Sequence, residues 1–351
     1  MIKKVSTLIF ALLMVLVLIT PALADGGVTG SVEVTNAAPT IATVTLQQND
    51  KITAATSMDP LTSYVVEIAA GDINTIDDIE TIEIYIYNDV DGGVNGIFTG
   101  AFDPDDRAIY KWTKSGADGV WTIEPGTVTV TSWTITEASS DTPGAGDFGL
   151  TTGEWNLVFT PGKMAVEAIG GAGAYSCWNV YVKVTDVTGA FAEQTLYSTA
   201  MTAYSEISMS LGTMNFGTLA LGGTAAIQDA GNVINTVVIA NDAHALGIMS
   251  AGTWTVGADT ITLDESGIPN APGEFGLVID DAATLGIPTT LQAVTGANAT
   301  ILGHTVDART ATTGGNEGTT NVPLYMSLQL FTSGIDIGLY TGTITFSVTN
   351  G

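Results

Sequence analysis

Three oxygen-bearing side chains alternate in one Gly-rich turn, at Asp89, Asp91 and Asn95. This spacing suits a hard cation, because Ca²⁺ takes about six to eight oxygen ligands from carboxylates, amides and carbonyls. The turn is not an EF-hand loop, since Gly93 and Gly100 stand at the fifth and twelfth loop positions, where that loop needs oxygen ligands. Further ligands are available in neighbouring loops, at Asp103, Asp105 and Asp106 or at Asp72, Asp77 and Asp78. The sequence therefore leaves two interpretations open: Asp and Asn as simple turn formers, which is the default, and a structural calcium site, which is the sharper hypothesis.

Two tryptophans point to a different kind of site. Trp112 and Trp121 flank the short stretch 115–119, as on the two strands of a hairpin. Exposed aromatic rings on a sheet can stack on sugar rings, which would give a carbohydrate-binding surface. Core packing is the commoner use of Trp in a β-sandwich, and both interpretations stay open.

Residues for catalysis are scarce. The two histidines, His244 and His304, show no metalloprotease spacing, and the chain has no nucleophile elbow. Its single cysteine, Cys177, forms no disulfide within one chain and is expected to be a buried, inert thiol.

Two further patterns match catalytic or cofactor-binding motifs in their residues but not in their context. The run 144–149 fits the Gly-x-Gly-x-x-Gly dinucleotide pattern but lacks the strand before it and the helix after it, so we expect a loop. The pair Asp280 and Asp281 resembles glycosidase carboxylates, but such pairs arise by chance in an acidic chain. We therefore expect a non-enzymatic protein without an organic cofactor, and a secreted hydrolase remains the weakest alternative.

The charge balance restricts the partners. The chain has 36 acidic and 9 basic residues, a formal net charge of −27, yet only 13% of its residues are charged. The negative net charge disfavours binding to nucleic acid and anionic lipid, and it favours binding to divalent cations or a cationic matrix.

The first 24 residues have the pattern of a secretory signal peptide. Lys3 and Lys4 precede an apolar run, and Ala22 and Ala24 precede Asp25 in a small-residue cleavage pattern. The apolar run is shorter than the roughly 20 residues of a membrane-spanning helix. We expect cleavage after residue 24, export to the cell surface, and no membrane span in the mature protein.

Past this segment, the sequence favours strands. Apolar residues alternate with polar ones in the runs 81–87, 178–184, 324–330 and 343–348, and Gly, Asn, Asp and Pro separate such runs. No later segment has a sustained helical period, and 41 glycines disfavour helices. We predict an all-β mature chain.

The length of the chain indicates two domains in tandem. Residues 25–205 contain five of the six tryptophans, and residues 206–351 contain one. We predict a β-sandwich with insertions over 25–205 and a second β-sandwich over 206–351.

Short motifs at these positions resemble known surface proteins. The run 36–44 resembles the opening strand of immunoglobulin-like modules in bacterial and archaeal surface proteins, and the run 178–189 resembles their closing hairpin with its Asp-x-x-Gly turn. The run 338–346 is similar to the last strand of secreted cell-wall and filament β-sandwiches. The resemblance implies immunoglobulin-like sandwiches of the kind found in surface layers, sheaths and filaments.

The segment 25–34 is a further candidate for assembly. A Gly-rich leader is followed by alternating residues up to Val34, which could complete the sheet of a neighbouring subunit or form the first strand of its own domain. Taken together, these features predict a secreted structural protein that assembles with itself or with other surface proteins. The alternative is a carbohydrate-binding adhesion module that uses exposed tryptophans to bind polysaccharide.

Overall fold

The computed structural model describes residues 36–88, 106–116, 118–124, 133–136, 139–144, 146–168, 177–224, 233–280, 292–306 and 319–350. Ala37–Gly351 forms one compact unit. Within the described ranges, twenty strands account for the regular structure apart from one 3-10 turn, η1 (Ile76–Asp78). The all-β prediction is confirmed, and the predicted signal peptide lies outside the described residues.

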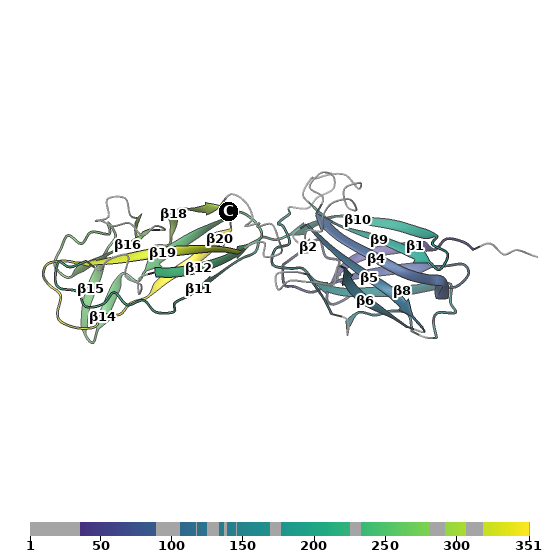
Figure 1. Ribbon diagram of the computed structural model, residues 1–351, viewed down its shortest axis with the longest axis horizontal. Coiled ribbons are helices and arrows are strands. Elements are labelled where there is room, and N and C mark those ends of the chain that lie inside the picture. Colours follow the sequence, from purple (N-terminus) through teal and green to yellow (C-terminus); the bar gives the residue numbers. More distant parts are fainter. Residues whose placement is uncertain are drawn as a thin grey trace, which may run out of the picture. The chain divides into compact units, whose positions relative to one another are not determined.

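The strands up to Met201 form two sheets, which we call the first sandwich (Figure 1). The four-stranded sheet has the order β1-β3-β8-β7, with β1 (Thr40–Gln48), β3 (Tyr64–Gly71), β8 (Thr152–Thr160) and β7 (Thr134–Ile135). The six-stranded sheet has the order β2-β10-β9-β4-β5-β6, with β2 (Ser57–Met58), β10 (Phe191–Met201), β9 (Trp178–Asp186), β4 (Ile79–Asn88), β5 (Arg107–Ser115) and β6 (Asp118–Glu124).

Period-2 alternation produces the buried face of the six-stranded sheet. Ile82, Ile84 and Ile86 of β4 are fully buried, while Glu83 between them is half-buried on the other face. Ile84 is paired with Val182 of β9 and, on the other side, with β5. The alternation therefore sends one face of β4 into the core, as the sequence predicts.

Aromatic rings fill the middle of this core. The ring of Phe159 lies 6.2 Å from that of Tyr64, 5.8 Å from that of Tyr110 and 5.9 Å from that of Trp133. The Trp133 ring also lies 5.0 Å from that of Trp178. These rings join strands of both sheets, so they hold the two layers together.

The hairpin between β9 and β10 ends in the predicted Asp-x-x-Gly turn. Oδ1 of the buried Asp186 accepts hydrogen bonds from the Thr188 and Ala190 backbone N–H groups and from the Thr188 hydroxyl, at 2.8–2.9 Å. Gly189 has a φ of 85°, a conformation that favours glycine. The local sequence thus fixes both the turn and the register of these two strands.

The strands from Ser205 onward form a second pair of sheets, which we call the second sandwich. The larger sheet has the order β11-β12-β19-β16-β15-β14, and β17 also pairs with β16. Its strands are β11 (Ser205–Met209), β12 (Val233–Ala240), β19 (Thr319–Leu330), β16 (Glu274–Asp280), β15 (Asp259–Asp264), β14 (Thr253–Val256) and β17 (Gln292–Ala293). The smaller sheet has the order β18-β13-β20, with β18 (Ala299–Val306), β13 (His244–Ser250) and β20 (Ile344–Asn350).

The core of the second sandwich lies around Trp254 and Phe275, whose rings are 4.8 Å apart. Gly342 sits directly on the Trp254 ring, where an added Cβ would lie 1.9 Å from Cδ1. Close approach therefore requires glycine at this position.

No strand up to Met201 shares a sheet with a strand from Ser205 onward among the described residues. The domain boundary near residue 205 nevertheless stays a prediction. No helix in the described ranges is long and apolar enough to span a membrane.

Candidate functional site

The predicted calcium ligands fall mainly outside the described residues. Asp89, Asp91, Asn95, Asp103 and Asp105 all lie there, and only Asp106 is described. The backbone carbonyl of Asp106 accepts a hydrogen bond from the Asn88 backbone N–H at 2.8 Å. The calcium site over residues 89–106 therefore stays a prediction.

The second set of carboxylates, Asp72, Asp77 and Asp78, is described. Oδ1 of Asp77 lies 2.6 Å from Nζ of Lys114, so this carboxylate is paired with a cation of the protein itself. Asp72 is only 2% exposed, and its Oδ1 accepts from the Asn74 backbone N–H at 2.8 Å, while its buried Oδ2 has no hydrogen-bond partner among the described residues. No group of three metal-ligating side chains converges anywhere in the described ranges.

Of the two interpretations of Trp112 and Trp121, the structure supports core packing and contradicts exposed, sugar-binding rings. Trp112 and Trp121 are directly opposite each other on β5 and β6, as the hairpin prediction requires, but they are 0% and 3% exposed. The Trp112 ring packs edge-on against Trp155, at 5.7 Å and 72°. Since neither ring reaches solvent, neither can stack on a sugar, and both serve the core.

Among the described residues, no three or more His, Cys, Asp or Glu side chains converge. His244 is buried, and one of its ring nitrogens lies 3.3 Å from the backbone carbonyl of Asp242. Cys177 is buried, as expected, with its Sγ 3.5 Å from Oδ1 of Asn179. Asp280 ends β16, and Asp281 lies outside the described residues, as do the side-chain surroundings of His304.

The described residues of the run 144–149 lie in a turn without strand or helix, as the loop prediction requires. Oδ2 of Asp147 accepts from the Gly144 backbone N–H at 3.1 Å, and the next strand, β8, follows the turn without a helix. The buried Phe148 anchors this loop to the core.

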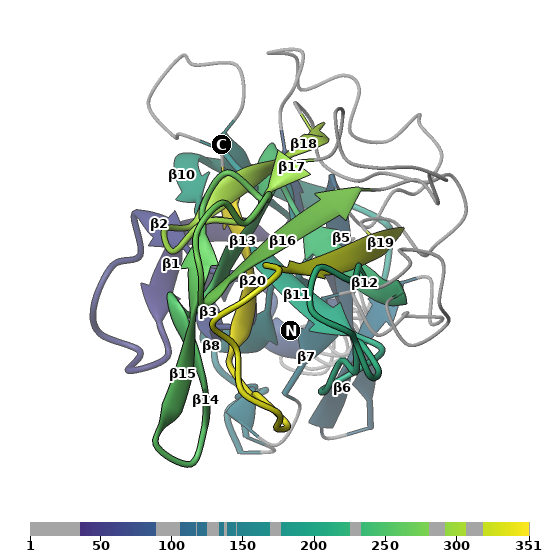
Figure 2. The ribbon, with the colours of Figure 1, turned by 90° about the vertical axis from the view of Figure 1, so that its left-hand side faces the viewer.

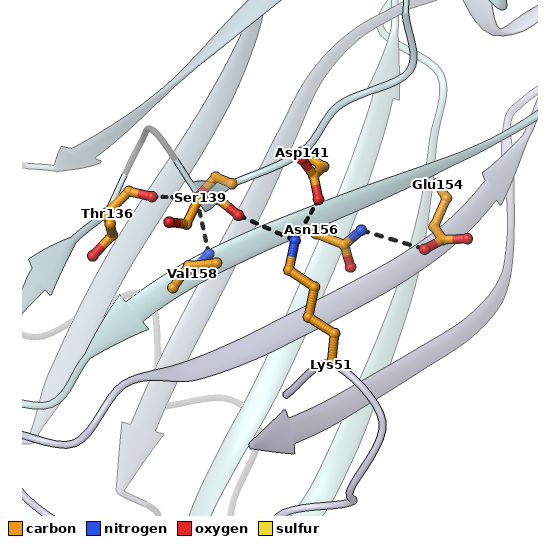
Figure 3. Close-up of polar contacts among 8 residues, drawn as sticks. Lys51, Thr136, Ser139, Asp141, Glu154, Asn156 and Val158 are labelled. Atoms are coloured by element: carbon orange, nitrogen blue, oxygen red, sulfur yellow. Dashed lines mark hydrogen bonds and ion pairs between the residues drawn. The ribbon is translucent and has the colours of Figure 1, made fainter. Parts of the chain in front are cut away.

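The first sandwich covers one edge of its smaller sheet, as Figure 3 shows. The described part of the segment 136–141 lies along β8: the Val158 backbone N–H donates to Oγ of Ser140 at 2.9 Å, and the backbones of Asp141 and Asn156 exchange hydrogen bonds of 3.0 and 2.8 Å. Nζ of Lys51 bonds the carbonyl of Ser139 and the carboxylate of Asp141. The backbone groups of Asn156 and Val158 on this edge are therefore occupied, and a charged side chain lies beside them, a common protection of sheet edges.

The second sandwich leaves an edge of its smaller sheet open. In Figure 2, β20 lies beside β13 and near β11. β20 pairs with β13 alone, and none of the hydrogen bonds of the described residues joins β20 to β11. Ile344, Phe346 and Val348 of β20 are half-buried and pack against the core, as does Ile207 of β11. We call this region, where β11 and β20 face each other without pairing, the β11–β20 seam.

Asn241, between β12 and β13, connects the two sandwiches. Its fully buried side chain donates from Nδ2 to the carbonyls of Ala165 and Thr202, at 2.7 and 3.0 Å. Its Oδ1 accepts from the Tyr204 backbone N–H at 2.6 Å, and its backbone N–H donates to the Tyr204 carbonyl at 3.0 Å. All of the polar groups of the Asn241 amide are thus used in fixing residues 165 and 202–204.

Charged groups surround this connection. Lys163 and Glu206 form an ion pair with Nζ and Oε1 2.6 Å apart, and the Tyr204 hydroxyl donates to Oε2 of Glu206 at 2.6 Å. A hydrogen bond with the Asp242 carboxyl raises the pKa of Glu167 from its ordinary 4.5 to about 7, and burial and repulsion from Asp242 act in the same direction. Glu167 therefore keeps its proton at mildly acidic pH.

Reasoning from the sequence missed both Asn241 and the seam. Asn241 stands in an Ala-Asn-Asp stretch between two strands, which has the pattern of an ordinary turn. The alternation in 343–348 predicts a strand but carries no information about which of its edges is paired.

Comparison with known proteins places the chain in no family. No protein-family model and no curated protein matches it. Among solved structures, BcpA, the major pilin subunit of Bacillus cereus, aligns at 13% identity over 84% of this chain and 73% of that chain, with a TM-score of 0.24.

Two further solved structures align at a similar level. A variant of the same pilin aligns at 10% identity over 82% of this chain and 56% of that chain, again with a TM-score of 0.24. A chaperone–tip adhesin complex of CFA/I fimbriae biogenesis aligns at 10% identity over 88% of this chain and 84% of that chain, with a TM-score of 0.21. The low identities and TM-scores leave the function to be argued from this chain alone.

Proposed function

We propose that this chain is a non-enzymatic structural protein of the cell surface that assembles with copies of itself into a filament, sheath or surface layer. The proposal rests on a difference between the two sandwiches in how completely their cores and strand edges are covered. The first has a closed aromatic core and a covered β8 edge, while the second leaves apolar side chains half-exposed along the unpaired edge of β20. A half-exposed apolar edge favours association with another polypeptide.

Composition supports the same function. With charged residues at 13% of the chain, the repulsion between copies is spread over a large and mostly neutral surface. Because all copies are acidic, a divalent cation would weaken the remaining repulsion, and calcium at the predicted loop 89–106 is part of this proposal.

The test is the assembly state of the secreted chain, purified without its first 24 residues. We expect polymers in electron micrographs and a broad, early elution in gel filtration, both increased by millimolar Ca²⁺ and reduced by a chelator. A protein that stays strictly monomeric over a wide range of concentration and calcium would contradict the proposal. Polymers that persist in the presence of the chelator would rule out the role of calcium, and the proposed self-assembly would still stand.

A further inference from the structure

The free edge of β20 has the geometry of an acceptor for one more strand. β20 is seven residues long and antiparallel to β13, and no hydrogen bond within the described ranges occupies its other edge. The backbone N–H and C=O groups on that edge have no ladder partner among the described residues, and an incoming strand would pair with them by displacing the nearby, unpaired β11.

The side chains around this edge determine which residue pattern an incoming strand would need. On β20, Ile344, Phe346 and Val348 point toward the core but stay half-buried, while Thr345 and Thr349 are exposed. Ile207 of β11 and Phe216 of the following segment are also half-buried against the same core. An incoming strand with small apolar residues on one face and polar residues on the other would therefore cover the seam.

The chain itself contains a segment with this pattern. In residues 28–34, Val28, Gly30, Val32 and Val34 occupy one alternating face and Thr29, Ser31 and Glu33 the other. The segment matches β20 in length and lies just before Asn36, where the described chain begins.

We propose that residues 28–34 of a second copy add a strand to the free edge of β20. The inference rests on the proposed self-assembly and names the contact that would produce it. Each copy offers a donor segment at one end and an acceptor edge in the second sandwich. Such a contact is heterologous, so it repeats from copy to copy into an open chain and does not stop at a dimer unless the rotation closes.

The first experiment changes the two faces of the donor segment in the full mature chain. The double variant Val32→Asp/Val34→Asp places charges on the face that would be buried, and we expect the polymer fraction to fall at least about tenfold. The matched control is Thr29→Asp/Ser31→Asp, which adds the same charge on the opposite face and should polymerise like the unchanged protein. Both variants should melt at the same temperature as the unchanged monomer.

The second experiment tests the acceptor edge without altering it. A synthetic peptide of residues 25–36 is added to the Val32→Asp/Val34→Asp protein, whose own donor is disabled. We expect saturable binding and slower amide hydrogen exchange in Ile344–Asn350, with no change in Thr253–Val256 of β14. A peptide with Val32→Asp should not bind.

The outcomes separate this inference from the proposed function. If the double variant polymerises normally, or the peptide leaves exchange in β20 unchanged, the strand addition is wrong while assembly stands. If the unchanged protein never polymerises, the proposed function fails, and the peptide still decides whether the edge accepts this segment. If the unchanged monomer already protects β20 and the double variant loses that protection and stability, the donor belongs to the same copy, which overturns the contact between copies.

Discussion

The two sandwiches differ in how completely they bury their apolar side chains. Among the described residues, the core of the first has 29 buried apolar residues and five partly buried ones, and that of the second has 16 and eleven. In the first, two sheets of four and six strands face each other, while in the second a sheet of three strands faces a much larger one. The smaller layer leaves apolar side chains half-covered, which favours contact with other molecules over stability of the isolated chain.

Sheet edges show the same contrast. The segment around Ser140 and the side chain of Lys51 cover part of the β8 edge, whereas β20, among the described residues, forms a ladder with β13 alone and lies near β11 without pairing with it. An alternating sequence therefore predicts a strand but does not predict whether its edge can take part in assembly. That depends on whether loops pass along the edge and cover it.

The largest expected effect is the loss of a core ring in the first sandwich. Phe159→Ala removes a fully buried ring that contacts three other aromatic rings and should lower the free energy of unfolding by about 3–5 kcal/mol. Phe346→Ala, at the half-buried seam, should cost only about 1–2 kcal/mol. Urea unfolding of dilute protein measures both. Equal losses would show that the seam is as well packed as the closed core.

Next comes the connection at Asn241. Asn241→Ala leaves the Tyr204 N–H and two carbonyls without their buried partner and should cost about 1–3 kcal/mol. Asn235→Ala, an exposed asparagine on β12, is the control and should change stability by less than about 0.5 kcal/mol. Thermal unfolding gives both values. If Asn241→Ala is as harmless as the control, the sandwiches do not depend on this side chain.

A smaller effect is expected from pH. Because the pKa of Glu167 is raised by its hydrogen bond with Asp242, by burial and by charge repulsion, the folded state holds this proton more tightly than the unfolded one. The stability from this pair is complete below about pH 4.5 and is lost as the pH rises to about 7; solvent limits it to below about 1 kcal/mol. Glu167→Gln and Asp242→Asn should each flatten this part of the pH profile of unfolding. A profile that keeps its slope in both variants would assign the slope to other groups.

The smallest effect is expected at the covered edge of the first sandwich. Lys51→Ala removes a surface pair in which the two side chains are 36% and 62% exposed, and should cost less than about 1 kcal/mol. Its informative readout is association, since the β8 edge keeps its backbone and Ser140 partners. We expect the polymer fraction to stay unchanged in light-scattering measurements. Increased aggregation would mean that the lysine, and not the loop, protects this edge.

The strands were predictable from the sequence because burial of one face imposes a period of two. Residues 81–87 and 178–184 lie in adjacent strands with their isoleucines and valines inside, and the Asp186 turn follows from its own residues. Pairing order was not predictable, since it depends on contacts between residues far apart in the chain. Trp112 and Trp121 illustrate the limit. Their hairpin could be predicted from the sequence, but the burial of Trp112 depends on the facing sheet, which brings Trp155 against it.

The position of Cys177 has a practical consequence. It is the sole cysteine of the chain, it is 5% exposed, and it directly precedes β9 of the first sandwich. A thiol reagent can therefore modify the protein only when this region opens. The labelling rate thus reports fluctuations of the first sandwich and not those of the second. The unmodified protein thus contains its own probe for asking which of its halves loosens first.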